Sequence, residues 1–205
     1  FFSKDNNFPL WSYATGGCIH SVAISKIYPC MLPYPDHDVA VTDVRPKTQG
    51  KVQAYQGLPF KINVTVQNQG DFTETFTVHL CANATVIGTQ TVTLASGITQ
   101  TITFLWNVPS DFPKGKYTLS ATASIVTDEI DIADNTFVDG IIRILFPGDL
   151  NGDGTVDIFD IVIVAAEFGR PPPPIVDIRA DVNCDGIVDI FDLVIVAAYF
   201  GQVDP

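Results

Sequence analysis

Alternation of apolar and polar residues dominates the middle of the chain, from residue 38 to residue 145. In "FKINVTVQ", Ile62, Val64 and Val66 alternate with polar residues, and "TQTITFLW" and "KYTLSATAS" have the same period of two. The stretch "ETFTVHLCANATVIGTQTVTL" predicts two strands joined by a turn at Asn83–Ala84. Short alternating strands separated by Gly- and Pro-containing turns are typical of an antiparallel sandwich. We therefore predict a β-sandwich here and no βαβ unit.

After residue 146 the apolar residues recur at a helical spacing in place of every second position. Ile161, Val164, Ala165 and Phe168 recur at the spacing of one helix face, and a twin stripe follows at Leu193, Val196, Ala197 and Phe200. We expect these two stripes to pack against each other as the core of a small module. The other helix faces are apolar as well, and a helix that is apolar all round is normally buried all round. The helices are therefore expected to dock onto another body.

Each helical stretch follows an acidic dodecapeptide, "DLNGDGTVDIFD" from residue 149 and "DVNCDGIVDIFD" from residue 181. Side-chain oxygens at positions 1, 3, 5, 9 and 12, a backbone carbonyl at position 7 and glycine at position 6 match the calcium loop of an EF-hand. An acidic surface turn is the alternative, but two copies in one register argue against chance. We predict two Ca²⁺ ions held by Asp149, Asn151, Asp153, Thr155, Asp157, Asp160, Asp181, Asn183, Asp185, Ile187, Asp189 and Asp192.

Position 12 is Asp in both copies, and no helix-like segment precedes either loop. With these features, residues 148–201 resemble a type I dockerin. The resemblance implies a calcium-folded module that binds a cohesin partner on another extracellular protein. Partner recognition in that family uses loop positions 10 and 11 and the following helix. Here these positions hold Ile158 and Phe159 in the first copy and Ile190 and Phe191 in the second, without the family's usual hydroxyl and basic residues.

The segments "HDVAVTDVRP", "VTVQNQGDFTETFTV", "VIGTQTVTL" and "ADNT" give residues 38–145 a second likeness. This stretch resembles the CARDB-type immunoglobulin-like domains of prokaryotic surface proteins, which implies a spacer or adhesion role without catalytic residues. A CARDB-type domain before a dockerin-like module is similar to archaeal surface proteins. The expected fold is mainly β: a sandwich in residues 38–146, an N-terminal β extension with a Pro-rich connector in residues 1–37, and a small α-helical module with paired calcium loops in residues 147–205.

The N-terminal extension contains "FSKDNN", "PLWSY" and "HSVAIS", and residues 1–25 resemble part of one repeat of a quinoprotein-like or WD-type propeller. A single blade cannot bury its own faces. Either a propeller precedes this piece, or its strand pairs with a sheet of its own domain or of a neighbouring copy by strand addition. Head-to-tail strand addition would give a fibre. The expected anchors are Phe1, Phe2, Phe8, Leu10 and Trp11.

Net charge and hydropathy exclude several classes of function. The chain carries a net charge of −12, concentrated in the calcium loops, and has no basic face for nucleic acid. No apolar run approaches the roughly 18 residues of a membrane span. No signal peptide is visible, so we expect a mature or trimmed form. The calcium loops and the glycosylation sequons at Asn63 and Asn83 favour an extracellular or cell-surface location.

Four cysteines allow three complete pairings. Cys18 and Cys30 are close in sequence and would close a short loop. Cys184 stands at loop position 4, where the first copy has Gly152, and a cysteine beside calcium ligands is expected to bridge to Cys81. The alternative is that these two residues are unpaired small apolar side chains.

No G-x-S-x-G, H-E-x-x-H or phosphate-binding glycine loop is present, and the Asp residues are accounted for by metal-ligand spacing. We therefore expect no enzyme. In the favoured interpretation, the chain is an extracellular structural subunit that assembles head to tail with other copies through strand addition and calcium-stabilised contacts. In the alternative, it is the C-terminal part of a larger surface protein whose dockerin-like module binds a cohesin-like receptor.

Overall fold

The computed structural model describes residues 36–47, 52–169 and 177–204. The expected anchors Phe1, Phe2, Phe8, Leu10 and Trp11, the cysteines Cys18 and Cys30 and the propeller-like segment lie outside these residues. Residues 36–205 form one compact unit, which contains every described residue.

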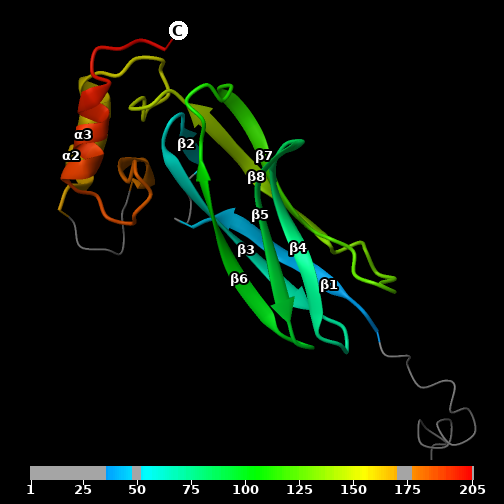
Figure 1. The fold of residues 1–205 in the computed structure, drawn as a ribbon. Helices are drawn as coiled ribbons and strands as arrows, with labels where there is room; N and C mark the ends of the chain where they lie inside the picture. The colour runs from blue at the N-terminus through cyan, green and yellow to red at the C-terminus, as the bar shows by residue number, and fades with distance from the viewer. Residues whose placement is uncertain (1–35, 48–51, 170–176, 205) are drawn as a thin grey trace, which may run out of the picture. The chain divides into compact units, whose positions relative to one another are not determined.

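In the described part of the chain, eight strands form two sheets. Figure 1 shows how these strands are arranged. The three-stranded sheet has the antiparallel order β1-β3-β6, formed by β1 (Val39–Pro46), β3 (Pro59–Asn68) and β6 (Thr99–Asn107). The five-stranded sheet has the order β2-β8-β7-β4-β5, formed by β2 (Gln53–Tyr55), β8 (Thr136–Leu145), β7 (Gly115–Ala123), β4 (Glu74–Ala82) and β5 (Thr85–Leu94). The predicted immunoglobulin-like sandwich is confirmed.

The alternation of the strands places one face of each sheet in a shared core. In β3, Phe60, Ile62, Val64 and Val66 are buried, while the residues between them are partly exposed. They share the core with Phe104 and Trp106 of the neighbouring β6 and with inward residues of the facing sheet, which include Phe76, Val78, Leu80, Leu119 and Ile144. The period of two read from the sequence therefore identified the core face correctly.

Strand β2 is only three residues long and pairs in parallel with β8, joining Gln53 to Arg143 and Tyr55 to Leu145. All three residues of β2 are buried, so alternation gives no sign of this strand. The pairing places Tyr55 beside the end of β8, from which the chain continues into the first acidic loop.

Two helices, α2 (Ile158–Glu167) and α3 (Ile190–Ala198), follow the two acidic loops and contact each other. One short 3-10 turn, η2 (Ile178–Ala180), precedes the second loop, so the expectation of no helix-like segment before either loop holds only for the first. Asp177 forms this turn, because its carboxylate accepts the backbone N–H of Arg179 and pairs with the Arg179 guanidinium at 2.6 Å.

The predicted inward stripe of the helices was wrong by part of a turn. Val164 is buried as expected, but Ala165 and Phe168 are exposed, as are Ala197 and Phe200 in the twin helix. The buried positions on α2 are instead Asp160, Val164 and Glu167. The loop causes this rotation, because Asp160 binds the backbone of the loop and so turns its own helix face inward.

Gly88 on β5 lies where the sandwich leaves no room for a larger side chain. A Cβ built at Gly88 would lie 2.6 Å from Cδ1 of Phe104, a side chain that is itself buried. We expect Gly88→Ala to destabilise the sandwich by about 1–3 kcal/mol, as overpacking does. Urea unfolding measures this change. Gly140→Ala on β8 is the control, because nothing lies within 4 Å of a Cβ there. Equal effects of the two substitutions would contradict the prediction.

Candidate functional site

The first acidic loop winds around the carboxylate of Asp149 at position 1. This buried carboxylate accepts backbone N–H groups from Gly152 at 2.7 Å, Asp153 at 3.1 Å and Gly154 at 3.0 Å. Gly154 at position 6 has φ +91°, a conformation that glycine adopts without strain. The sharp turn predicted at position 6 is therefore present.

The second loop repeats this arrangement around Asp181. Its buried carboxylate accepts backbone N–H groups from Asp185 at 3.1 Å and Gly186 at 3.2 Å. Gly186 has φ +96°, close to the value of its counterpart in the first loop. The two copies thus share a backbone conformation as well as a sequence.

The Asp at position 12 ties the start of each loop to the start of its helix. Asp160 is fully buried and accepts the backbone N–H of Leu150 at 2.8 Å and that of Asp157 at 2.9 Å. Asp192 is fully buried too and accepts the N–H of Val182 at 2.7 Å. Positions 1 and 12 of each loop are therefore drawn together by backbone hydrogen bonds.

The Asp at position 9 of each loop lies immediately before the following helix. Asp157 and Asp189 are the N-caps of α2 and α3, and their carboxylates accept the backbone N–H of Phe159 and Phe191, both at 2.8 Å. In each helix the Asp at position 12 bonds back to the N-cap N–H, which completes a capping box. The same carboxylates that form the loop therefore fix where the helix starts.

Positions 3 and 5 are held by local bonds on the exposed side of the loop. The Asn151 amide donates to Asp153 at 2.8 Å, and the Thr155 hydroxyl donates to the same carboxylate at 2.7 Å. Hydrogen bonds from Thr155 lower the pKa of Asp153, which keeps this carboxylate charged. The Asn183 amide donates to Asp185 in the same way at 2.9 Å.

The donor set suits a hard divalent cation. It consists of oxygen atoms alone, and burial raises the pKa of Asp149 and Asp192, so their charged forms call for a compensating cation. No three His, Cys, Asp or Glu side chains in the described ranges form a metal-binding group by themselves. Amide oxygens and the position 7 carbonyls of Thr155 and Ile187 would complete the shell of a bound ion, as in EF-hand loops.

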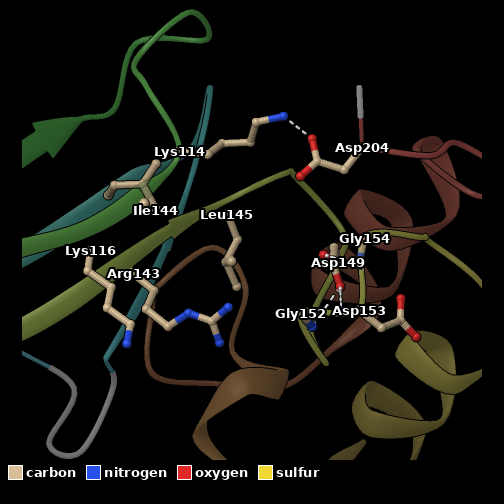
Figure 2. A pocket seen from close by; sticks show the side chains of 11 residues that line it. Lys114, Lys116, Arg143, Ile144, Leu145, Asp149, Gly152, Asp153, Gly154 and Asp204 are labelled. Atoms are coloured by element: carbon tan, nitrogen blue, oxygen red, sulfur yellow. Dashed lines mark hydrogen bonds and ion pairs between the residues drawn. The ribbon is translucent and has the colours of Figure 1, made fainter.

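Position 4 of each loop faces the sandwich. A Cβ at Gly152 would lie 3.3 Å from a guanidinium nitrogen of Arg143, so glycine permits this close approach, which Figure 2 shows. Cys184 in the second loop has φ +58° and is buried in the core cluster of the sandwich. Its carbonyl accepts a bond from the Lys61 ammonium at 3.1 Å. Both loops therefore contact the sandwich through the same position.

The expected bridge between Cys81 and Cys184 does not form in the structure. Cys81 lies on β4 between Leu80 and Ala82, both of which point into the core, so its own side chain faces outward. Cys184 instead contributes to the core cluster itself. Cys81 thus points away from the core to which Cys184 contributes, and Cys184 takes the role of a small buried apolar residue.

Tyr55 joins the sandwich to the calcium module. It belongs to β2, yet it is buried in the core cluster of the module together with Leu145 of β8 and Val164 and Val196 of the two helices. Its hydroxyl donates to Gln53 at 3.2 Å. Burial, followed by the charges around the loops, raises the pKa of Tyr55, so the side chain stays neutral. The sandwich therefore completes the module core.

A cavity of about 470 Å³ lies between β8 and the first loop (Figure 2). Lys114 at its edge forms an ion pair with Asp204 near the chain's end. The charged side chains of the cavity have opposite signs on its two sides: Lys114, Lys116 and Arg143 belong to the sandwich, and Asp149, Asp153 and Asp204 belong to the module. The strand side thus offsets part of the negative charge of the first loop.

One face of each helix remains uncovered. Phe159 and Phe191 are 65% and 64% exposed, and their apolar neighbours Ile158, Val162, Ile190 and Val194 are more than half exposed. Docking of these faces onto another body, which the apolar surface of the helices led us to expect, stays a prediction. We call the two sets Ile158–Phe159–Val162 and Ile190–Phe191–Val194 the twin apolar faces.

The two sequons lie on the sandwich. Asn63 is on β3, and its side chain accepts a bond from the Thr103 hydroxyl at 2.9 Å. Asn83 is exposed in the β4–β5 turn with φ +52°, and its side chain accepts the N–H of Thr118 at 2.9 Å. Glycosylation at these positions stays a prediction. Among the described residues, no helix has both the length and the apolar composition needed to cross a membrane.

Sequence reasoning missed the residues of the sandwich that meet the loops. Tyr55, Lys61 and Arg143 carry no motif, and they meet the module only because β2 pairs with β8 and contacts β3. The exchange of Gly152 for Cys184 at position 4 was the one visible sign of contact with the sandwich.

Comparison with solved structures returned several partial matches. The crystal structure of a CARDB domain from Pyrococcus furiosus, in complex with di-metal ions, is 19% identical over 55% of this chain and 97% of its own, with a TM-score of 0.45. The solution NMR structure of that domain is 20% identical over 54% and 97%, with a TM-score of 0.44. A β-glucosidase from Erythrobacter marinus is 14% identical over 53% of this chain but only 16% of its own, with a TM-score of 0.38.

Comparison with curated proteins gave no match. Two family models match the sequence. The CARDB model covers residues 38–136, and the dockerin type I domain model covers residues 147–201. Both agree with the likenesses read from the sequence, in the same order along the chain. This chain therefore carries a CARDB domain followed by a dockerin type I domain.

Proposed function

We propose that this chain is a non-catalytic extracellular structural protein that docks onto a folded, cohesin-like protein partner through its calcium-loaded module. The observation that carries the proposal is the pair of twin apolar faces. Each presents the same Ile-Phe dipeptide in the first turn of a helix, directly after a calcium loop.

The size of the exposed apolar side chains supports a docking role. Ile158 and Val162 are one helical turn apart and lie beside Phe159, so they form one continuous face. Contiguous apolar patches on soluble proteins commonly mark interaction sites. Fully burying a side chain such as Phe or Ile contributes about 1.5–3 kcal/mol. Three such residues on one face supply the core of an interface.

The chemistry of the face defines the partner. Ile158, Phe159 and Val162 carry no charge, so the matching surface must be apolar and must belong to a folded domain that presents it in a fixed shape. The two faces have the same residues and nearly the same exposure. A partner that fits one face therefore also fits the other.

Calcium controls the face because the loops set the first turn of each helix. Asp157 and Asp189 act both as N-caps and as position 9 of the loops, and each caps the Phe of its own face. Losing the ion would free the loop and with it the placement of Phe159 and Phe191. Docking is therefore expected to require calcium, which is abundant outside cells.

Head-to-tail assembly of this chain with itself is the second candidate. The twin apolar faces are uncovered in a single copy, so the sandwich of another copy is an alternative occupant. Its proposed strand-addition contact uses Phe1, Phe2, Phe8, Leu10 and Trp11, which lie outside the described residues. The two candidates differ in the partner and share the docking face.

The test is binding of the full chain to immobilised cohesin domains in calcium, followed by sedimentation of the chain alone. We expect Phe159→Ser combined with Phe191→Ser to weaken binding at least 30-fold, since truncation of a central aromatic anchor costs about 2 kcal/mol or more. Either substitution alone should leave most of the binding, because one face remains.

Ile130→Ser is the matched control, since Ile130 on the sandwich is 86% exposed and apolar but lies outside the module. Binding that is unchanged in the double variant would refute the docking face. If no cohesin domain binds and the chain alone forms long assemblies that the double variant lacks, the partner is a second copy and self-assembly replaces the cohesin proposal.

A further inference from the structure

A second group of acidic and amide side chains gathers at the opposite end of the β7–β8 hairpin. Strand register places Gly115 beside Ile144 near the calcium module and Thr122 beside Thr136 at the far end. Just beyond that far end, the chain between β7 and β8 carries Glu129, Asp134 and Asn135. Asp38, immediately before β1, joins them there.

Backbone contacts hold these residues together. The N–H of Val39, next to Asp38, donates to Glu129 at 2.9 Å, and the N–H of Val41 donates to the Asp134 carbonyl at 2.9 Å. Gln69 bonds both sides of the group: its N–H donates to the Asp38 carbonyl at 2.9 Å and its amide to the Asp134 carboxylate at 3.0 Å. Asp38 and Asp134 are therefore neighbours, although they are distant in sequence.

Glu129 is already satisfied by hydrogen bonds from the protein. Its two oxygens accept N–H groups from Val39 at 2.9 Å, Val126 at 2.9 Å and the Asn135 amide at 3.1 Å. This last bond also fixes the orientation of Asn135, because only the NH₂ side of an amide can face a carboxylate. The Asn135 carbonyl oxygen must therefore point away from Glu129.

Three oxygens of the group have no donor. Oδ1 of Asp38, Oδ1 of Asp134 and Oδ1 of Asn135 are buried and accept no hydrogen bond within the described structure. The Asn135 residue is only 3% exposed, so bulk water does not reach its carbonyl. Buried polar atoms without a partner are uncommon in native proteins, and each indicates a missing ligand or an ordered water.

The local charge is negative and uncompensated. Within the described residues, no Lys or Arg side chain forms an ion pair with Asp38, Glu129 or Asp134. Burial, followed by the neighbouring carboxylates of Asp134, Asp131, Glu129 and Asp36, raises the pKa of Asp38 to about 6. The group thus has the electrostatics of a cation site rather than those of an anion site.

A single water molecule donates two hydrogens and leaves one of the three oxygens unpaired. A hard divalent cation accepts carboxylate and amide oxygens together, and Ca²⁺ tolerates an irregular shell completed by carbonyls and water. We propose that Asp38, Asp134 and Asn135 form a third calcium site, located in the CARDB domain and separate from the two dockerin loops.

The site has a structural consequence for the sandwich. Asp38 precedes β1, an edge strand of the three-stranded sheet, and Asp134 and Asn135 precede β8 of the five-stranded sheet. An ion shared by these residues would clamp the two sheets together at the end where the N-terminal segment enters.

The test is calcium stoichiometry of the full chain, measured by equilibrium dialysis and elemental analysis. We expect three ions per chain, falling to two in Asp134→Asn, which removes the charge at nearly constant shape. A chain with both loops disabled, Asp149→Ala with Asp181→Ala, should still bind one ion, and calcium should still raise its sandwich melting temperature. Asp111→Asn is the control, because Asp111 is exposed and lies outside the group.

Saturation of the full chain at two ions, unchanged in Asp134→Asn, would overturn the proposal and indicate that ordered water satisfies these oxygens. Terbium luminescence of the chain with both loops disabled gives a second readout of this site, because intact loops would bind terbium as well. If Asp134→Asn lowers the stoichiometry and the control does not, the site is assigned even where the loop-disabled chain folds poorly.

Discussion

Removing calcium is expected to unfold residues 147–201 while the β-sandwich stays folded. In both loops the carboxylates at positions 1 and 12 are buried, and two buried carboxylates side by side repel each other without a cation. An ion present at 1,000 times its Kd stabilises the folded state by about 4 kcal/mol, so two loops supply about 8 kcal/mol. That equals a large part of the roughly 5–15 kcal/mol by which a whole domain is stable.

The measurement is the helical circular dichroism signal of the full chain during titration with a calcium chelator. We expect the signal to fall on chelation and to recover with added calcium but not with the same concentration of magnesium. Asp149→Ala with Asp181→Ala should have the chelated spectrum at any calcium concentration. A helical signal and melting curve that are the same with and without chelator would show that the module folds without the ion.

Truncating Tyr55 is expected to separate the calcium module from the sandwich. Tyr55 is fixed by β2 of the sandwich but fills the core of the module beside Val164 and Val196. Replacing a buried aromatic residue by alanine typically costs about 3–5 kcal/mol. Because the lost contacts join the sandwich to the C-terminal module, we expect these two parts to unfold separately. The single melting transition of the calcium-loaded chain should therefore split into two in Tyr55→Ala.

Calorimetry in excess calcium measures this directly. Tyr55→Phe is the control, since it keeps the ring and removes the hydroxyl, whose bond to Gln53 contributes about 1 kcal/mol. One unsplit transition in Tyr55→Ala would mean that Lys61, Arg143 and the Phe146–Tyr199 ring contact hold the two bodies together without it.

The spacing of oxygen-bearing residues was enough to locate both acidic loops and the turn that each makes at position 6. EF-hand geometry is local, so each ligand position follows from a dozen consecutive residues, and the capping of α2 and α3 by Asp157 and Asp189 follows from the same residues. Alternation was also sufficient for β3, β4, β6 and β7, because one face of each is buried.

Contacts between distant segments were not predictable in the same way. The sequence did not indicate which side of α2 and α3 is buried, because both helices have apolar residues on every side. In α2 the buried side is set by Asp160, whose carboxylate accepts the backbone N–H of Leu150. Cys184 was correctly singled out as unusual, but a buried place in the sandwich core explains it better than a bridge to Cys81. Asp38 meets Asp134 only after β1 and β8 are placed.

Position 4 holds different residues in the two loops, and this difference limits the transfer of the module to another protein. Gly152 fits against Arg143, whereas Cys184 fills a place in the sandwich, so the two halves of the internal duplication are no longer interchangeable. A gene fusion that moved residues 147–205 onto a different neighbour would expose Cys184 and remove Tyr55 from the module core. The duplicated segment therefore depends on this particular sandwich for part of its packing.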